Sequence, residues 1–228
     1  MINQQIIPLF IFGVGNVGST LIKQIEERFS NQYQNSENQI RIVFVANSKK
    51  AIFNANGIDV QQAENLSNHG KLYDEQLVIK FASDQGFQHP ILVDVTASND
   101  FVLQYSAYIN VGFHIVAANK KANTLPIYEY QKLKAELSKN QRKFLYETNV
   151  GAGLPIIQTI SDLKQSKEQI IKIRGVFSGS LSYIFNHFEK EDVSFTDVLN
   201  QAEYLGLTEP DAREDLSGQD VARKLLIL

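Results

Sequence analysis

Short apolar runs alternate with longer amphipathic stretches through the first two thirds of the chain. Apolar positions with helical spacing predict helices at residues 17–29, 100–110 and 127–138. The short runs are rich in β-branched and aliphatic residues, and several are apolar on both faces, as buried parallel strands are. Strands separated by helices indicate an α/β fold with a doubly wound parallel sheet. The predicted strands are residues 7–12, 40–46, 91–95, 113–117 and 143–147, with a weaker one at 77–81.

The pattern changes after a glycine-rich turn at residues 151–155, and we therefore expect two domains, 1–149 and 150–228. The second part predicts an α+β domain with a strand at 170–177. Its last segment, 216–228, ends on four aliphatic residues without a cap, which favours an incomplete second domain. Its predicted helices are residues 156–163, 181–188 and 195–205.

Charge and composition exclude several classes of protein. The chain has 22 Lys and Arg against 25 Asp and Glu, a net charge of −3, which argues against nucleic-acid binding through a basic surface. It has no cysteine, so disulfides, thiolate metal sites and cysteine nucleophiles are excluded. Without an apolar run of about 18 residues or a signal sequence, we expect no membrane association and a cytoplasmic location.

A glycine motif follows the first predicted strand and opens the first predicted helix. Its three glycines allow a tight turn, close approach of a pyrophosphate to the backbone, and close packing of helix on strand. The start of the helix offers free N–H groups and the positive end of its dipole to phosphates. In this position the motif predicts a Rossmann-type dinucleotide site, whose expected residues are Phe12, Gly13, Val14, Gly15, Asn16, Val17 and Gly18.

The end of the second predicted strand bears on the choice of cofactor. Proteins that prefer NAD often carry an acidic residue there for the ribose 2′-hydroxyl. This chain instead has Asn47, and Lys49 and Lys50 follow it. The missing carboxylate and the two lysines favour NADP, with NAD as the alternative, although the lysines also fit a solvated loop.

Further candidate residues follow later strands. Thr96 and Ser98 can offer hydroxyls to the nicotinamide ribose or the phosphates, although capping of the next helix explains them equally well. Lys120 follows the strand at 113–117 and can face nicotinamide and substrate, although such loop lysines are commonly just exposed. Asp220 and Lys224 lie four residues apart on one helical face, and spacing alone favours an exposed ion pair.

The histidines give no comparable signal. They have neither metal-ligand spacing nor a Ser/His/Asp arrangement, and we expect structural or surface roles for His69, His89, His114 and His187.

Six motifs together resemble homoserine dehydrogenases along essentially the whole chain. They are FGVGNVG at 12–18, DVTAS at 94–98, ANKKA at 118–122, YETNVGAGLPII at 146–157, GVFSGSLSYIFN at 175–186 and GLTEPDAREDLSGQDVARK at 206–224. The resemblance implies NAD(P)-dependent interconversion of L-homoserine and L-aspartate 4-semialdehyde, a step toward threonine and methionine. It makes residues 1–149 the NAD(P)-binding domain, and 150–228 the first part of a substrate and dimerisation domain.

The resemblance also implies roles for individual residues. Lys224 would be the general acid/base, with Lys120 near nicotinamide and substrate. Glu209 and Asp220 would hold the amino group of the amino-acid substrate, with Asp215 in the same pocket. A sodium ion would be bound by backbone carbonyls around Glu147, Val150, Ala152 and Leu154, and the protein would form a homodimer.

Two other interpretations compete with this one. Family members continue past the last motif, so the chain can alternatively be a catalytically incomplete fragment that binds NADP and dimerises. A semialdehyde dehydrogenase of the phosphorylating kind is disfavoured, because its cysteine nucleophile is missing.

Overall fold

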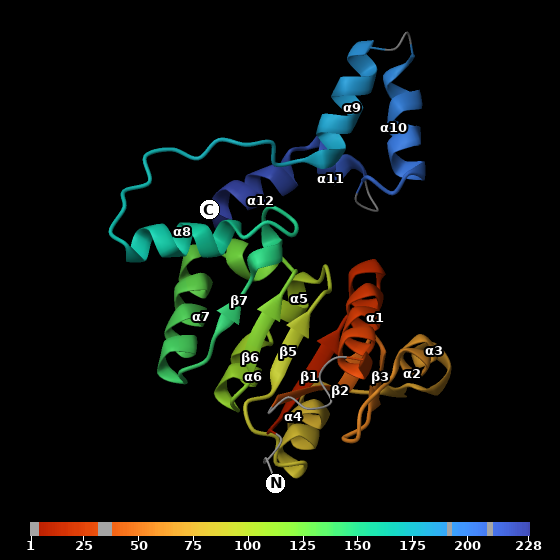
Figure 1. Ribbon diagram of the computed structural model, residues 1–228, viewed down its shortest axis with the longest axis vertical. Helices are drawn as coiled ribbons and strands as arrows, with labels where there is room; N and C mark the ends of the chain where they lie inside the picture. Colours follow the sequence, from red (N-terminus) through yellow and green to blue (C-terminus); the bar gives the residue numbers. More distant parts are fainter. Residues whose placement is uncertain (1–4, 32–37, 191–192, 209–211) are drawn as a thin grey trace. The chain divides into compact units, whose positions relative to one another are not determined.

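A computed structural model describes residues 5–31, 38–190, 193–208 and 212–228. They divide into two compact units, Met1–Tyr146 and Glu147–Leu228 (Figure 1). Within the described residues, no helix is both long and apolar enough to cross a membrane.

The first unit is built on a seven-stranded sheet of order β4-β3-β2-β1-β5-β6-β7. The central strand β1 pairs in parallel with β2 and β5, and β6 and β7 continue the parallel part. β3 and β4 add an antiparallel edge beyond β2. The predicted Rossmann-type α/β fold is therefore confirmed. The strands are β1 (Gln5–Phe12), β2 (Asn38–Ala46), β3 (Lys50–Phe53), β4 (Lys71–Leu72), β5 (Ile91–Asp94), β6 (His114–Ala117) and β7 (Phe144–Leu145).

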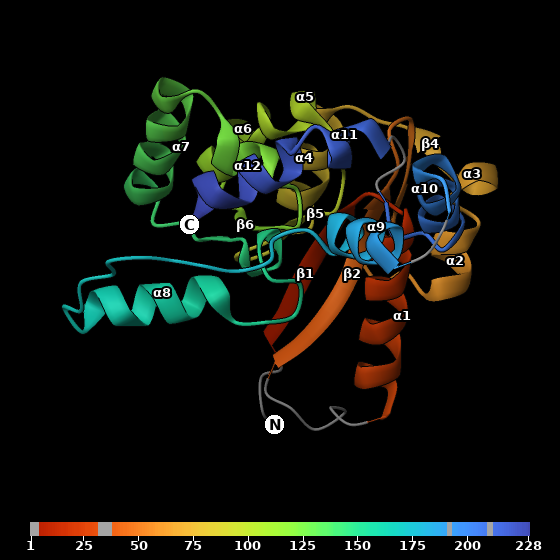
Figure 2. The ribbon, with the colours of Figure 1, turned by 90° about the horizontal axis from the view of Figure 1, so that it is seen from above.

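Helices cover both faces of this sheet. Leu9, Ile11 and Val45 face one apolar layer with α1, α2 and α3, whereas Phe10 and Phe44 face another with α4 to α7. Figure 2 shows α1 on one side of β1 and β2, with α4, α5 and α6 on the other. The helices are α1 (Asn16–Asn31), α2 (Val60–Glu64), α3 (Leu66–His69), α4 (Glu75–Asp84), α5 (Asn99–Val102), α6 (Tyr105–Asn110) and α7 (Ile127–Lys139), with a 3₁₀ turn η1 (Lys121–Thr124).

Several predicted elements differ from the observed ones. The weak strand at 77–81 is wrong, because these residues form the middle of α4, whose N-cap Asp74 accepts a hydrogen bond from the N–H of Leu77. The buried residues of α4, Val78 and Ala82, are four apart, which is helical spacing. The helix at 100–110 is interrupted between α5 and α6. Most of the polar loop expected at 31–39 lies outside the described residues.

The described part of the second unit is helical, so the α+β character expected there is not observed. The strand expected at 170–177 is wrong, because no described residue of this unit pairs with that segment. Its Ile171 and Val176 are 92% and 82% exposed. A small core forms where Ile184 of α9 meets Val198 and Ala202 of α10. The elements are η2 (Glu147–Asn149), α8 (Ile156–Gln165), α9 (Gly179–Lys190), α10 (Phe195–Tyr204), α11 (Ala212–Leu216) and α12 (Gln219–Ile227).

Candidate functional site

The glycine motif forms the turn between β1 and α1. Gly13 has a φ of +108°, and a Cβ there would lie 2.7 Å from the carbonyl oxygen of Val95. A Cβ on Gly18 would collide with the carbonyl oxygen of Gly13. Around Gly15, by contrast, no described atom lies within 4 Å of the Cβ position. Two glycines therefore close the turn, and the third leaves open space at the start of α1.

This turn borders a cleft of about 1130 Å³ at the carboxyl ends of β1, β2 and β5. Ligands of open α/β sheets bind at this edge. Seven of the predicted cofactor residues line the cleft, and five others, Asn16, Val17, Gly18, Lys49 and Lys120, do not. The seven are Phe12, Gly13, Val14, Gly15, Asn47, Thr96 and Ser98.

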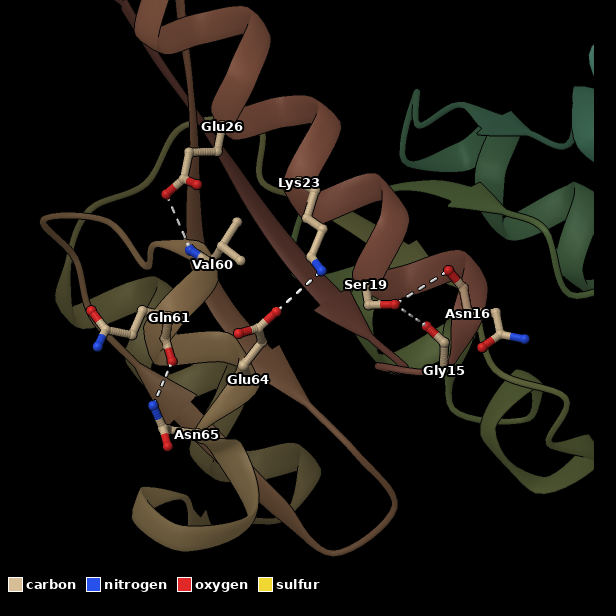
Figure 3. Close-up of polar contacts among 9 residues, drawn as sticks. All are labelled: Gly15, Asn16, Ser19, Lys23, Glu26, Val60, Gln61, Glu64 and Asn65. Atoms are coloured by element: carbon tan, nitrogen blue, oxygen red, sulfur yellow. Dashed lines mark hydrogen bonds and ion pairs between the residues drawn. The ribbon is translucent and has the colours of Figure 1, made fainter.

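Polar contacts hold α1 beside α2 and fix the first turn of α1 (Figure 3). Lys23 of α1 lies 3.2 Å from the carboxylate of Glu64, and Glu26 accepts a hydrogen bond of 3.2 Å from the N–H of Val60. Ser19 donates to the carbonyl oxygen of Gly15 at 2.9 Å. These contacts steady the helix whose N-terminus borders the cleft.

The loop after β2 is ordered by Asn47. Its side-chain oxygen accepts hydrogen bonds of 2.8 Å from the N–H groups of Lys49 and Lys50. The two lysines differ, because the Nζ of Lys50 donates to the carbonyl oxygen of Ser67 at 2.7 Å, whereas Lys49 is exposed. Of the pair, Lys49 therefore remains available for a phosphate.

Residues 73–76 also line the cleft, although the sequence did not single them out. The hydroxyl of Tyr73 donates to the carbonyl oxygen of Asn47 at 2.8 Å, and burial raises the pKa of this phenol. This contact joins segments 26 residues apart, so no local sequence signal marks it.

A buried carboxylate lies behind the loop that follows β5. Asp94 is 0% exposed and accepts hydrogen bonds from the N–H of Thr96 (2.8 Å), the hydroxyl of Tyr105 (2.6 Å) and the amide of Asn119 (3.0 Å). Burial raises the pKa of Asp94, and these bonds oppose the shift. Burial, together with the charge of Asp94, also raises the pKa of Tyr105. Asp94 and Asn119 belong to the DVTAS and ANKKA motifs, but no site role was predicted for either.

The structure also bears on the alternative roles of Ser98 and Lys120, a helix cap and an exposed loop lysine. Ser98 does cap α5, because its hydroxyl accepts a hydrogen bond from the N–H of Phe101, and it lines the cleft as well. Lys120 is half-buried rather than exposed, at the start of η1.

In the second unit, Lys224 and Asp220 form the expected pair on α12. Their charged atoms are 2.7 Å apart, and the Nζ of Lys224 also donates to the carbonyl oxygen of Phe177 at 2.6 Å. The side chains are only 19% and 14% exposed, so the exposed ion pair that spacing favours is wrong. Contact with the backbone of Phe177, 47 residues away, draws the lysine out of solvent. Glu209 lies outside the described residues, and Asp215 lies on α11.

The glycine-rich turn at 151–155 has an irregular backbone. Gly151 and Ala152 have φ values of +86° and +52°, and the carbonyl oxygen of Leu154 accepts a hydrogen bond from the N–H of Ile156. The sequence missed the role of the Glu147 side chain, which accepts hydrogen bonds from Ile157 and Gln158 at the start of α8. The described residues hold no cluster of three or more His, Cys, Asp or Glu suited to a metal ion.

His89 and His114 lie near each other at the amino ends of β5 and β6, with ring centroids 5.8 Å apart. Arg142 lies 2.9 Å from the ring of His89, and His114 accepts a hydrogen bond from the N–H of Lys143. Burial and the charge of Arg142 lower the pKa of His114.

Comparison with known proteins adds family evidence to this geometry. Residues 13–147 match the family model described as the homoserine dehydrogenase NAD binding domain, and residues 155–228 match the one described as homoserine dehydrogenase. A bifunctional aspartokinase/homoserine dehydrogenase of Haemophilus influenzae is 40% identical over 228 residues, 99% of this chain and 28% of the relative. A chloroplastic relative of the same description, from Arabidopsis thaliana, is 37% identical over 96% of this chain and 24% of its own length.

Solved structures have the same fold. A Candida auris protein of unknown function has a TM-score of 0.81 and 30% identity over 98% of this chain and 62% of its own. A hyperthermophilic archaeal homoserine dehydrogenase in complex with NADPH has a TM-score of 0.79 and 23% identity, over 98% of this chain and 68% of its own. The chain spans about a quarter of the two sequence relatives and about two thirds of the two solved chains. The two family models together match most of the chain, which therefore belongs to the homoserine dehydrogenase family.

Proposed function

We propose that the protein interconverts L-homoserine and L-aspartate 4-semialdehyde, with NADP(H) as the favoured cofactor and NAD(H) as the alternative. The observation that carries this proposal is the position of Lys224, held by Asp220 and by the carbonyl oxygen of Phe177. A lysine held in this way suits proton transfer to an oxygen of an amino-acid substrate.

The residues of the cleft fit a dinucleotide. Open space at Gly15 and the N-terminus of α1 suit a pyrophosphate. Asn47 and Lys49 suit the adenosine ribose and its 2′-phosphate, and Thr96 and Ser98 suit the nicotinamide half. When bound, the cofactor supplies a hydride to the aldehyde carbon and accepts it in the reverse direction.

The residues of the chain then position the substrate and move a proton. The Lys224 ammonium stabilises negative charge on the carbonyl oxygen and donates a proton to it, and in the reverse direction its amine accepts that proton. We assign the substrate ammonium to Glu209 and Asp220, with Asp215 in the same pocket, and a position near the nicotinamide and the substrate to Lys120.

We further propose a sodium ion at the carbonyls of Glu147, Val150, Ala152 and Leu154. The positive φ values of Gly151 and Ala152 support it, because such a turn takes carbonyls out of regular hydrogen-bond ladders. Replacing sodium with choline should lower the thermal midpoint, and an unchanged midpoint would contradict the ion. A cytoplasmic homodimer completes the proposal, to be tested by cell fractionation and sedimentation.

The test is oxidation of NADPH after addition of aspartate semialdehyde, beside a direct titration of NADPH and NADH. Lys224→Ala should lower turnover by roughly a hundredfold or more and leave NADPH affinity nearly unchanged. The exposed Lys164 of α8 provides a control, because Lys164→Ala removes a lysine of the same unit and should leave turnover unchanged. Turnover of Lys224→Ala within a few-fold of wild type would exclude the assignment.

A second candidate is a fragment that binds NADP and dimerises without turnover. Tight NADPH binding without oxidation by this chain would support it.

A further inference from the structure

Asp94 occupies the point where the loops after two neighbouring strands meet. Its carboxylate reaches the N–H of Thr96, in the loop after β5, and the side chain of Asn119, in the loop after β6. Its backbone carbonyl accepts a hydrogen bond from the N–H of Ala118 at 2.9 Å. One buried residue therefore ties together the carboxyl ends of β5 and β6.

Asn119 extends this connection in both directions. Its amide donates to Asp94 and to the carbonyl oxygen of Ser98, each at 3.0 Å, and its oxygen accepts a hydrogen bond from the N–H of Lys121. The residues on either side of Lys120 are therefore fixed by the same side chain that fixes Ser98. With 4% exposure, Asn119 makes these bonds largely out of competition with water.

The donors around Asp94 require a charged acceptor. The N–H of Thr96 and the NH₂ group of Asn119 can only donate, and the carboxylate accepts a hydrogen bond from each of them and from the Tyr105 hydroxyl. An asparagine at this position would bring a donor NH₂ group against donors, and would leave at least one of them unsatisfied in a buried place.

The order of the strands places this network relative to the cofactor. β1 carries the pyrophosphate turn, β2 lies on one side of it, and β5 and β6 lie on the other. The residue after β2 serves the adenosine ribose in this fold, so the nicotinamide half belongs over β5 and β6. Residues 95–98, which form the wall of the cleft on that side, follow Asp94 directly.

We infer that Asp94, acting through Asn119 and the N–H of Thr96, is a positioning residue that shapes the wall for the nicotinamide half of the dinucleotide. This role rests on the proposed cofactor site and adds a residue that does not itself line the cleft. The contribution is confined to one half of the cofactor, because the adenosine side is ordered separately by Asn47 and Tyr73.

The test compares two ligands in direct binding titrations: NADPH, and 2′,5′-ADP, which contains only the adenosine half. In Asp94→Asn, NADPH affinity should fall roughly tenfold or more, as expected when a buried donor loses its acceptor, while 2′,5′-ADP affinity stays within about twofold. Tyr105→Phe removes one donor to Asp94 and should cause a smaller loss of the same selective kind.

A matched control lies on the same helix. Tyr108 is as buried as Tyr105, and its hydroxyl has no hydrogen-bond partner among the described residues. Tyr108→Phe should therefore leave both affinities unchanged, and it shows the effect of losing a buried hydroxyl outside the network. Circular dichroism verifies that each variant folds. If Asp94→Asn does not fold, the NADPH and 2′,5′-ADP affinities of Tyr105→Phe are compared with those of Tyr108→Phe, and a selective loss of NADPH affinity in Tyr105→Phe alone supports the positioning role.

Each outcome distinguishes this inference from the cofactor proposal. Equal weakening of both ligands, or unchanged NADPH affinity, in the folded variants would overturn the positioning role and leave only a structural one. A wild-type chain that binds 2′,5′-ADP as tightly as NADPH would overturn it too, because the nicotinamide half would then contribute nothing. A wild-type chain that binds neither ligand would overturn the cofactor site itself, and with it this role.

Discussion

In the turn after β1, one glycine is required by the packing of the fold and another leaves space for a ligand. Gly18 is buried, and a Cβ there would collide with the backbone of Gly13, whereas the corresponding position on Gly15 is open. The glycine motif thus combines a packing requirement at its last residue with a binding requirement at its middle one.

We therefore expect different effects from alanine substitutions at these two positions: a loss of stability at Gly18 and a loss of NADPH affinity at Gly15. Gly18→Ala should destabilise the first unit by about 1–3 kcal/mol, the usual cost of overpacking, because the Gly13 backbone must move. Gly15→Ala should leave the unfolding midpoint nearly unchanged and weaken NADPH binding, because its methyl group fills the space for the pyrophosphate. Urea unfolding and NADPH titration measure the two effects. Equal loss of stability in both variants would contradict this division.

The residues of the site could be predicted from the sequence where the signal is local. The turn at 13–18 is specified by three closely spaced glycines after an apolar strand, and its place in the cleft follows from the fold. Tyr73 and Asp94 were missed because their contacts depend on tertiary structure: Tyr73 reaches Asn47, and Asp94 reaches Asn119. For Asp94, the sequence did carry one signal: an aspartate within the otherwise apolar predicted strand at 91–95.

Helices and strands were predicted well where their own sequence pattern determines the structure, and poorly where pairing with a neighbouring strand determines it. α1 and α7 follow from helical periodicity. The antiparallel strands β3 and β4, of four and two residues, are too short to show a period and depend on their pairing with neighbouring strands. The segment 170–177 has a strand-like sequence, yet it forms no strand, because no described strand pairs with it.

Helix α8 depends on a residue outside it, and this leads to a testable effect. The Glu147 carboxylate accepts hydrogen bonds from Ile157 (2.8 Å) and Gln158 (3.0 Å), N–H groups that lack partners within the helix. Glu147→Gln keeps the shape and removes the charge that favours a helix N-terminus. We expect a loss of about 0.5–2 kcal/mol in the local stability of α8.

Hydrogen exchange measures this change directly. Protection of the Ile157 and Gln158 amides should fall in Glu147→Gln, while amides of α9 and α10 keep theirs. Glu168→Gln is the control, because Glu168 is exposed just beyond the end of α8. Unchanged protection at the start of α8 would show that the carboxylate does not hold the helix.

At the scale of the whole molecule, the two units divide the proposed work. Every described residue that lines the cleft belongs to Met1–Tyr146, and so does the Asp94 network. Lys224 and Asp220 belong to Glu147–Leu228. Cofactor binding should therefore require only the first unit, and reduction of the aldehyde should require both.

A chain ending at Tyr146 tests this division. It retains the complete sheet and both of its apolar layers, so it should fold and bind NADPH within a few-fold of the affinity of the full chain. It should also sediment as a monomer, whereas the full chain, in which the apolar side chains of Ile171 and Val176 are exposed, should sediment as a dimer. NADPH titration and analytical ultracentrifugation of the two chains give both answers. A folded short chain that does not bind NADPH would show that the second unit completes the cofactor site, and a monomeric full chain would exclude the proposed homodimer.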